Sequence, residues 1–239
     1  MRARFLVVRG VELVEGSCAL PYEESHHVRD VLRLRPGAPL TLSDGRGRLA
    51  DAKISSSKRE VIVEIHAVRK APLPRTSITM FQAIGKSDKV DRVVRGAAEL
   101  GIARFVPVST ARSVAEREQR RDRWASIAED SARVSGRAFL MEIDPITTLE
   151  AVAARSRAAV SICFSGDAST RLSALDLRVD SVELLVGPEG GLEPHELELL
   201  VENGFVPVGL GPHTLRTETA GLATAAIVTF LVGGFDDGL

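Results

Sequence analysis

Two glycine-bearing loops in the last third of the chain have residue types and spacing that suit a ligand site. The first, Gly187–Gly191, reads Gly-Pro-Glu-Gly-Gly and directly follows the apolar stretch Val182–Val186. The second, Leu210–Gly221, follows another apolar stretch, Phe205–Gly209. Glycines let backbone amides and carbonyls approach a ligand closely, because no side chain stands in the way. In open α/β sheets, ligands bind at the carboxyl ends of the strands, where both loops would lie.

The first loop taken alone does not identify a ligand. It lacks the Lys-Ser/Thr pair of a P-loop and the GxGxxG spacing of a dinucleotide fingerprint, so neither a nucleoside triphosphate nor NAD is indicated. A tight turn between a strand and a helix that begins near Pro194 would also explain its glycines. The second loop is needed to favour a binding site over a simple turn.

The second loop carries an arginine, Arg216, that helix capping does not explain. Helix capping and the helix dipole account for Thr217, Glu218 and Thr219 at the start of the last predicted helix. They do not account for Arg216. An arginine just ahead of a helix amino terminus suits an anion or a developing negative charge at that position.

Charge is distributed unevenly along the chain, although the net charge is only -1. Residues 1–137 contain 26 Lys and Arg against 17 Asp and Glu, whereas residues 138–239 contain 5 against 15. The basic part could bind a polyanion by displacing counterions, and the acidic part would not. Two solvated charged faces are the alternative explanation.

The cysteines and histidines favour neither a disulfide framework nor a metal site. Cys18 and Cys163 stand far apart in apolar surroundings, as expected for two buried, reduced thiols. The five histidines lack metal-ligand spacing, so we expect no metal. The segment Met1–Gly10 has no apolar stretch long enough for a signal peptide, and the apolar helix predicted at Thr217–Leu231 is too short to cross a bilayer. We therefore expect a cytoplasmic protein without a membrane partner.

The sequence patterns predict two domains. Residues 1–70 read as a small β-rich domain with one helix at His27–Leu34 and a turn at Asp44–Gly47. Residues 71–76 contain two prolines and read as a stiff linker. Residues 77–239 alternate strands and helices, which is typical of an α/β domain with a mainly parallel sheet.

In the second domain, apolar runs predict strands and amphipathic periods predict helices. The predicted strands are Ile78–Ile84, Phe105–Val108, Ala159–Phe164, Val182–Val186 and Phe205–Gly209. The first predicted helix has its apolar positions between Val90 and Ala98 and ends before Gly101. The others are Arg117–Val134, Leu149–Ala154, His195–Glu202 and Thr217–Leu231, and we expect the last of these to be buried, as at a subunit contact.

Several motifs together resemble those of the RsmE-type ribosomal RNA uridine-N3 methyltransferases of the SPOUT class. They are VGPEGG at Val186–Gly191, LRTETAG at Leu215–Gly221, KSDKVDRVVRGAAELGI at Lys86–Ile102, RSV at Arg112–Val114 and SGR at Ser135–Arg137. In addition, HHVRDVLRLRPG at His26–Gly37 and SDGRG at Ser43–Gly47 are similar to that family's PUA-like RNA-binding domain. The chain departs from the family pattern at Val134, usually glutamine, and at Ala111 in a motif that usually reads SERS.

The resemblance implies a fold and an activity that the residue patterns alone do not show. The fold would be a trefoil-knotted α/β domain with helices on both faces of the sheet, preceded by a small PUA-like β-barrel. The chain would form a homodimer and methylate N3 of one uridine in 16S ribosomal RNA, free or in the assembled small subunit, with S-adenosylmethionine as cofactor and no metal.

The resemblance also implies site residues. We expect Arg216 and Glu218 to be catalytic, with Arg216 stabilising the uracil anion or positioning its phosphate and Glu218 accepting the proton. We expect RNA to contact Lys86, Lys89, Arg112 and Arg137. The cofactor would be held by Phe164, Ser165, Gly166, Gly187, Pro188, Glu189, Gly190, Gly191, Leu210, Gly211, Leu215, Thr217 and Thr219.

Two other functions are weighed against this one. A non-catalytic RNA-binding or ribosome-assembly factor would use the basic part but would not need two glycine loops. A small-molecule enzyme on a doubly wound sheet would use the loops but leave the basic part without a role.

Overall fold

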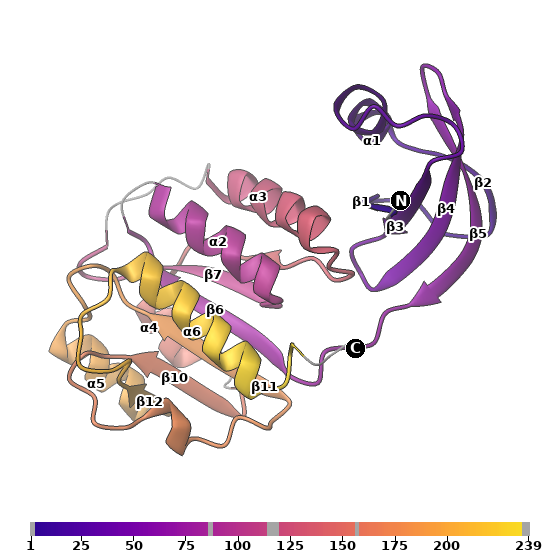
Figure 1. Ribbon diagram of the computed structural model, residues 1–239. Coiled ribbons are helices and arrows are strands. Elements are labelled where there is room, and N and C mark those ends of the chain that lie inside the picture. The colour runs from indigo at the N-terminus through magenta and orange to yellow at the C-terminus, as the bar shows by residue number, and fades with distance from the viewer. Residues whose placement is uncertain (1–2, 86–87, 114–119, 156–157, 236–239) are drawn as a thin grey trace. The chain divides into compact units, whose positions relative to one another are not determined.

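The computed structural model describes residues 3–85, 88–113, 120–155 and 158–235 (Figure 1). The chain divides into two compact units, Met1–Leu73 with Ala132–Leu140, and Pro74–Ser131 with Met141–Leu239. The sequence patterns placed residues 132–140 in the second domain, whereas they group with the first unit. This segment joins the first unit through long-range contacts, which no local pattern reveals.

The first unit is a five-stranded sheet in the order β1-β3-β4-β5-β2. Strands β1 and β3 pair in parallel, and the other pairs are antiparallel. Inward-facing residues alternate with outward-facing ones along β4 and β5, which produces a core of small and branched apolar side chains. The strands are β1 (Arg4–Val7), β2 (Gly16–Ala19), β3 (Pro39–Ser43), β4 (Arg48–Ser57) and β5 (Val61–Lys70).

The helix of the first unit differs from its prediction at both ends. Helix α1 (Tyr22–His26) continues into the π-helical turn η1 (His27–Val31), so the predicted limits of His27 and Leu34 were wrong. The helix begins earlier because Pro21, at its N-cap, fixes a backbone angle that suits a helix start. It ends earlier because Arg33 adopts a left-handed conformation with φ of 52°.

The predicted turn Asp44–Gly47 receives the segment Ala132–Leu140. The backbone amide of Gly47 donates to the carbonyl of Ala138 (3.0 Å), and the amide of Leu140 donates to the carbonyl of Gly45 (2.9 Å). A Cβ atom on Gly45 would lie 2.7 Å from the Leu140 side chain, and one on Gly47 would lie 2.3 Å from the Phe139 ring. The glycines therefore leave room for two apolar side chains, as well as supplying the turn.

The second unit is built on a parallel sheet in the order β12-β10-β11-β6-β7-β8, with β9 also paired to β7. This confirms the mainly parallel α/β fold. The short strands β8 and β9 were not predicted, because two residues are too few to show a periodic pattern. The strands are β6 (Ser77–Ala83), β7 (Arg104–Ser109), β8 (Glu142–Ile143), β9 (Thr147–Thr148), β10 (Val160–Phe164), β11 (Ser181–Val186) and β12 (Phe205–Val208).

Helices cover both faces of this sheet, as predicted. On β11, Leu184 and Val186 belong to a core formed with α2, α3 and α6, whereas Leu185 belongs to a core formed with α4 and α5. Helix α6 lies along α2 (Figure 1). The helices are α2 (Asp88–Leu100), α3 (Arg120–Ser135), α4 (Leu149–Ala154), α5 (Pro194–Glu202) and α6 (Thr217–Leu231), and a short 3-10 turn, η2, spans Leu172–Ala174.

Both cysteines are free thiols, but they differ in burial. Cys163 is fully buried on β10, and burial raises its pKa to about 12. Cys18 is only half-buried, which corrects the expectation that both are buried. Among the described residues, no three His, Cys, Asp or Glu side chains are grouped so as to hold a metal ion. None of the helices described is both long and apolar enough to span a membrane.

A buried carboxylate joins α2 to α3. Asp91 is 7% exposed and accepts hydrogen bonds from Nε of Arg123 (2.9 Å) and from the indole Nε1 of Trp124 (2.9 Å). Trp124 is the largest fully buried side chain among the described residues. Its N–H group therefore depends on Asp91 for a hydrogen-bond partner.

We predict that Asp91→Ala lowers the free energy of unfolding by about 1–3 kcal/mol, because it leaves the Trp124 N–H group buried without an acceptor. Urea unfolding followed by tryptophan fluorescence measures the loss. The exposed Asp180 of the same unit provides a matched control, since Asp180→Ala should change the stability by no more than about 0.5 kcal/mol. Equal stability of the two variants would contradict a structural role for Asp91.

Candidate functional site

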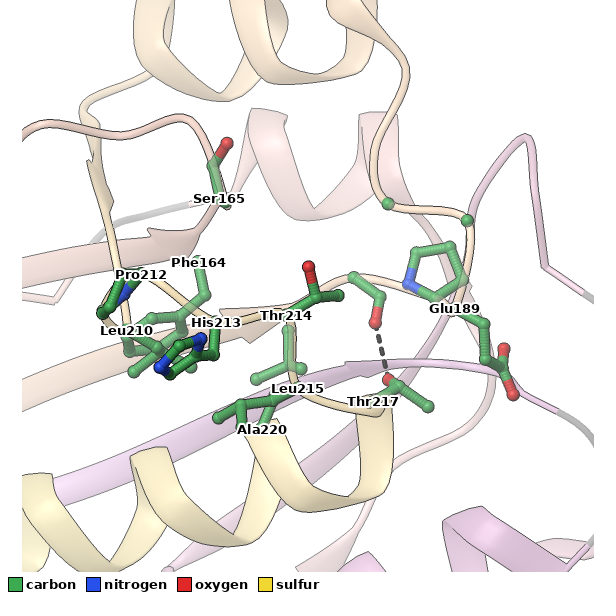
Figure 2. Close-up of a pocket in the computed structure, with 17 residues that line it drawn as sticks. Phe164, Ser165, Glu189, Leu210, Pro212, His213, Thr214, Leu215, Thr217 and Ala220 are labelled. Carbon is green, nitrogen blue, oxygen red and sulfur yellow. Dashed lines mark hydrogen bonds between the residues drawn. The ribbon is translucent and has the colours of Figure 1, made fainter.

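A pocket of about 350 Å³ lies where β10, β11 and β12 end. These strands are neighbours and parallel, so the loops that follow them meet at one edge of the sheet. In Figure 2, Phe164, Leu210 and His213 gather at one end of the pocket and Glu189 lies at the other. The lining consists of Phe164, Ser165, Gly166, Val186, Gly187, Pro188, Glu189, Gly190, Gly191, Leu210, Gly211, Pro212, His213, Thr214, Leu215, Thr217 and Ala220.

The pocket brings together three segments that the sequence analysis had singled out separately. All the predicted cofactor residues line it except Thr219, which is exposed on α6. Four other lining residues lie in the predicted loop Leu210–Gly221 but were not named as cofactor residues: Pro212, His213, Thr214 and Ala220. Val186, the last residue of β11, was not named either. They flank or lie between predicted ones, so including each loop together with its flanking residues would have found them.

A hydrogen bond joins the loop after β11 to the start of α6. The Thr217 hydroxyl donates to the carbonyl of Gly187 (2.7 Å), as the dashed line in Figure 2 marks. The amide nitrogen of Gln82, on β6, donates to the same hydroxyl oxygen (3.1 Å). Arg216 is the N-cap of α6, and no side chain caps this helix. The sequence analysis explained Thr217 by helix capping. Instead, its hydroxyl joins the pocket wall to the loop after β11, and it does not cap α6.

Two carboxylates and one ammonium group meet beside the pocket. Nζ of Lys89 lies 2.8 Å from Oε1 of Glu189 and 3.7 Å from Oε2 of Glu218. The hydrogen bond to Glu189 raises the pKa of Lys89 above its ordinary value, although partial desolvation and the positive charge of Arg216 oppose the shift. Glu218 is 9% exposed, and its Oε2 has no hydrogen-bond partner in the described part of the chain.

Arg216 has fewer contacts than the charged residues beside it, Lys89, Glu189 and Glu218. It is exposed, and its backbone is extended at the N-cap position of α6. Within the described ranges, its side chain forms no hydrogen bond or ion pair, while its charge acts on Lys89. The guanidinium is therefore available to an anionic group that enters from solvent.

Arg112 holds the loop after β11 in place. Its Nη1 donates a hydrogen bond to the carbonyl of Gly190, and its Nε donates to Glu193 (3.0 Å). A Cβ on Gly190 would lie 2.9 Å from Cδ of Arg112, so a larger residue there would require the arginine side chain to shift. The carboxylate of Glu196, in the first turn of α5, accepts from the backbone amide of Ala111 (2.8 Å), which ties the segment after β7 to the start of that helix.

Three of the four residues predicted to contact RNA lie within the described part of the chain, and they occupy different environments. Lys89 and Arg112 lie beside the pocket and already have protein partners. Arg137 belongs to the first unit, on the segment that follows α3. Lys86 lies outside the described residues. RNA contact by these four side chains stays a prediction.

Comparison with known proteins connects this geometry to a family. An RNA methyltransferase domain matches residues 71–229, and an RNA methyltransferase PUA domain matches residues 20–65. The ribosomal RNA small subunit methyltransferase E of Mycobacterium tuberculosis is 32% identical over 227 residues, covering 90% of this chain and 86% of that protein. The chain belongs to the ribosomal RNA small subunit methyltransferase E family. The resemblance of its motifs is thereby confirmed.

Other members agree in sequence and in structure. The methyltransferase E of Aquifex aeolicus is 33% identical over 175 residues, or 72% of this chain and 76% of that protein. The Neisseria gonorrhoeae methyltransferase E, solved with bound S-adenosyl methionine, superposes with a TM-score of 0.89 at 27% identity, covering 96% of this chain and 98% of that one. A Legionella pneumophila protein, solved in complex with SAM, gives the same TM-score, identity and coverage.

Close contact between α6 and β6 depends on a glycine in the LRTETAG motif. A Cβ on Gly221 would lie 2.7 Å from Oε1 of Gln82 and 3.1 Å from Met80 and Val93 side-chain atoms. All three neighbours are buried, so they have little room to move. Gly221 therefore sets how closely the pocket wall formed by α6 approaches the sheet.

We predict that Gly221→Ala lowers the free energy of unfolding by about 1–3 kcal/mol, because the added methyl group overpacks the interface between α6 and β6. Thermal unfolding measures the change. Gly166 is the matched control, because a Cβ there meets nothing within 4 Å. Gly166→Ala should leave the stability unchanged or raise it slightly. A Gly221→Ala protein as stable as Gly166→Ala would show that α6 does not need this close approach.

Proposed function

We propose that this protein transfers the methyl group of S-adenosylmethionine to N3 of a specific uridine in 16S ribosomal RNA of the small subunit. The observation that carries the proposal is the pocket at the ends of β10, β11 and β12, in a chain of the methyltransferase E family. Its volume of about 350 Å³ lies in the range of small-molecule sites. A family member at 27% identity was solved with S-adenosyl methionine.

The lining of the pocket fits this cofactor. Phe164 and Leu210 provide apolar surface for a flat, largely apolar group such as adenine. The glycines at Gly187–Gly191 let a ligand come close to the loop backbone, in which the carbonyls of Gly187 and Gly190 already accept hydrogen bonds from Thr217 and Arg112. The bound cofactor supplies an electrophilic methyl group on a cationic sulfur. When the methyl group is transferred, the rest of the cofactor is left as a neutral thioether. For that reason the reaction requires no metal and no covalent protein intermediate.

The protein's own residues must make uracil N3 reactive. N3 carries a proton and is a poor nucleophile, so the site must accept that proton or stabilise the anion that remains. Arg216 is the proposed electrostatic partner of the uracil anion, because its guanidinium is exposed beside the pocket. Glu218 is the proposed proton acceptor, because its buried Oε2 lacks a hydrogen-bond partner in the described structure.

The basic N-terminal part is the proposed platform for RNA. The matched PUA domain lies in residues 20–65, within the part of the chain that has excess positive charge. Neutralising phosphates with Lys and Arg provides affinity that does not depend on sequence. Lys86, Lys89, Arg112 and Arg137 are proposed to add contacts near the reacting nucleotide, which must be unpaired or flipped out for its N3 to be reached.

A knotted chain, a homodimer and a cytoplasmic location complete the proposal. The proposed knot rests on the resemblance to the family, and the return of the chain after the edge strand β12 to pack α6 against α2 and β6 agrees with it. Knots are rare among folds, so this topology distinguishes the family.

Apolar side chains exposed at the end of α6 support a subunit interface: Ile227, Phe230, Leu231 and Phe235. A non-catalytic RNA-binding factor would leave the pocket without a role.

Methyl mapping tests the proposed function. The protein is incubated with labelled S-adenosylmethionine and small subunits that lack the modification, and the RNA is digested for nucleoside analysis. We expect the label in 3-methyluridine from 16S RNA. Label in another nucleoside would contradict the N3 assignment, and unlabelled RNA would contradict the methyltransferase activity.

We predict that Arg216→Ala reduces methyl transfer by about 100-fold, the effect expected when one preorganised electrostatic partner of the transition state is lost. Arg216→Lys should restore only part of the rate, because an ammonium group cannot reproduce the planar guanidinium. Single-turnover rates on small subunits measure both effects.

Stability measurements on the same variants separate catalysis from structure. Since the Arg216 side chain is exposed, Arg216→Ala should unfold at the wild-type temperature and keep its affinity for cofactor. A joint loss of stability and cofactor binding would indicate that Arg216 only braces the loop. A folded variant with near-normal turnover would remove the assigned role.

A further inference from the structure

Gln82 is a buried polar residue that the motifs of the pocket do not include. It lies near the end of β6, is 1% exposed and is in register with Val186 of β11, which lines the pocket. Its Nε2 donates to the carbonyl of Ala83 (3.2 Å) and to Oγ1 of Thr217 (3.1 Å). Its Oε1 has no partner among the described residues.

The orientation of the Gln82 amide follows from its neighbours. The carbonyl of Ala83 can only accept a hydrogen bond, so the amide nitrogen, and not the oxygen, must face it. The same nitrogen then faces the Thr217 hydroxyl, which has to act as an acceptor there. A hydroxyl has a single proton, and that proton is left for the carbonyl of Gly187, 2.7 Å away. The three groups form a chain of hydrogen bonds with one direction.

We propose that Gln82 is a positioning residue for the cofactor pocket, which acts by orienting the Thr217 hydroxyl toward the carbonyl of Gly187. The inference rests on the proposed function, because it concerns how the same pocket is held ready for S-adenosylmethionine. Without Gln82, the Thr217 proton could turn to another acceptor, and the loop after β11 would lose its direct hydrogen bond to α6, while the link through Lys89 to Glu189 and Glu218 would remain. Part of the binding free energy would then be spent on ordering the loop.

The unpartnered oxygen of Gln82 supports a functional role over a structural one. A buried amide oxygen without a hydrogen bond costs stability, so a residue selected only for packing would be apolar here. Helix α6 comes so close to this oxygen that a Cβ on Gly221 would lie 2.7 Å from it. Gln82 thus occupies a tight position where, among the described residues, only its side-chain nitrogen forms hydrogen bonds.

Replacement of Gln82 by Met tests the proposal, because Met is similar in size and removes both the two hydrogen bonds and the unpartnered oxygen. Gln82→Met should therefore unfold near the wild-type temperature. Its affinity for S-adenosylhomocysteine, measured by calorimetric titration, should fall by about 10-fold, as for the loss of one hydrogen bond. In methylation assays, KM for S-adenosylmethionine should rise while KM for small subunits stays the same.

Variants of Thr217 provide a second test that does not alter β6. Thr217→Ser keeps the hydroxyl and should keep the affinity for S-adenosylhomocysteine, whereas Thr217→Val should lose about 10-fold. The double variant Gln82→Met with Thr217→Val should be no weaker than Thr217→Val alone, because both changes break one chain of hydrogen bonds. Thr229→Val is the matched control, since Thr229 is buried on the same helix and its hydroxyl has no partner in the described structure.

The outcomes separate this inference from the proposed function. Wild-type protein that does not bind S-adenosylhomocysteine would contradict the proposed function itself. If the wild type binds, wild-type affinity in folded Gln82→Met would overturn the positioning role. Equal affinities of Thr217→Ser and Thr217→Val would overturn it as well, and so would fully additive losses in the double variant.

Discussion

The pocket depends on one hydrogen bond, from the hydroxyl of Thr217 to the carbonyl of Gly187. It joins the loop after β11 to the first residue of α6, although β10 separates β11 from β12, the strand that precedes α6. Parallel pairing brings the strand ends to one edge of the sheet, but pairing alone does not fix the distance between their loops. The bond fixes one direct contact between the two loops, and Lys89 adds a second link between Glu189 and Glu218. The close approach of α6 at Gly221 allows both to form.

Several charges around the pocket hold its loops in place, a role that the sequence alone does not show. Lys89 and Arg112 read as surface cations ready for phosphate, yet each is bound to the pocket's own loop, through Glu189 and through the carbonyl of Gly190. Because their charges are partly neutralised by contacts within the protein, any contribution that they make to RNA affinity should be smaller than that of an arginine without a protein partner. Arg216 has no such partner in the described structure, which is why the proposed chemistry is centred on it.

Local patterns predicted two helices of this fold with their correct limits. The helices Leu149–Ala154 and Thr217–Leu231 have the predicted limits, and the glycine loops lie in the pocket where the order of elements places them. The helix near His27 was predicted with the wrong limits, because a π-helical turn and a left-handed Arg33 leave no periodic signal.

Long-range partners could not be predicted from the sequence. The segment Ala132–Leu140 fills glycine positions in the first unit, and Gln82 bonds to a threonine 135 residues away. Each depends on how the chain packs after its elements have formed. A single sequence shows which residues are polar or small, but does not show which of them meet.

The central claim is that the two glycine loops form a site for S-adenosylmethionine, and ligand-dependent thermal unfolding of the wild-type protein tests it most directly. A ligand that binds only the folded state, at about a hundredfold excess over its Kd, adds about 2.7 kcal/mol to the stability. S-adenosylmethionine and S-adenosylhomocysteine should each raise the Tm by several degrees, and NAD and ATP should leave it nearly unchanged. An unchanged Tm at saturating S-adenosylmethionine, or an equal rise with NAD, would contradict the account.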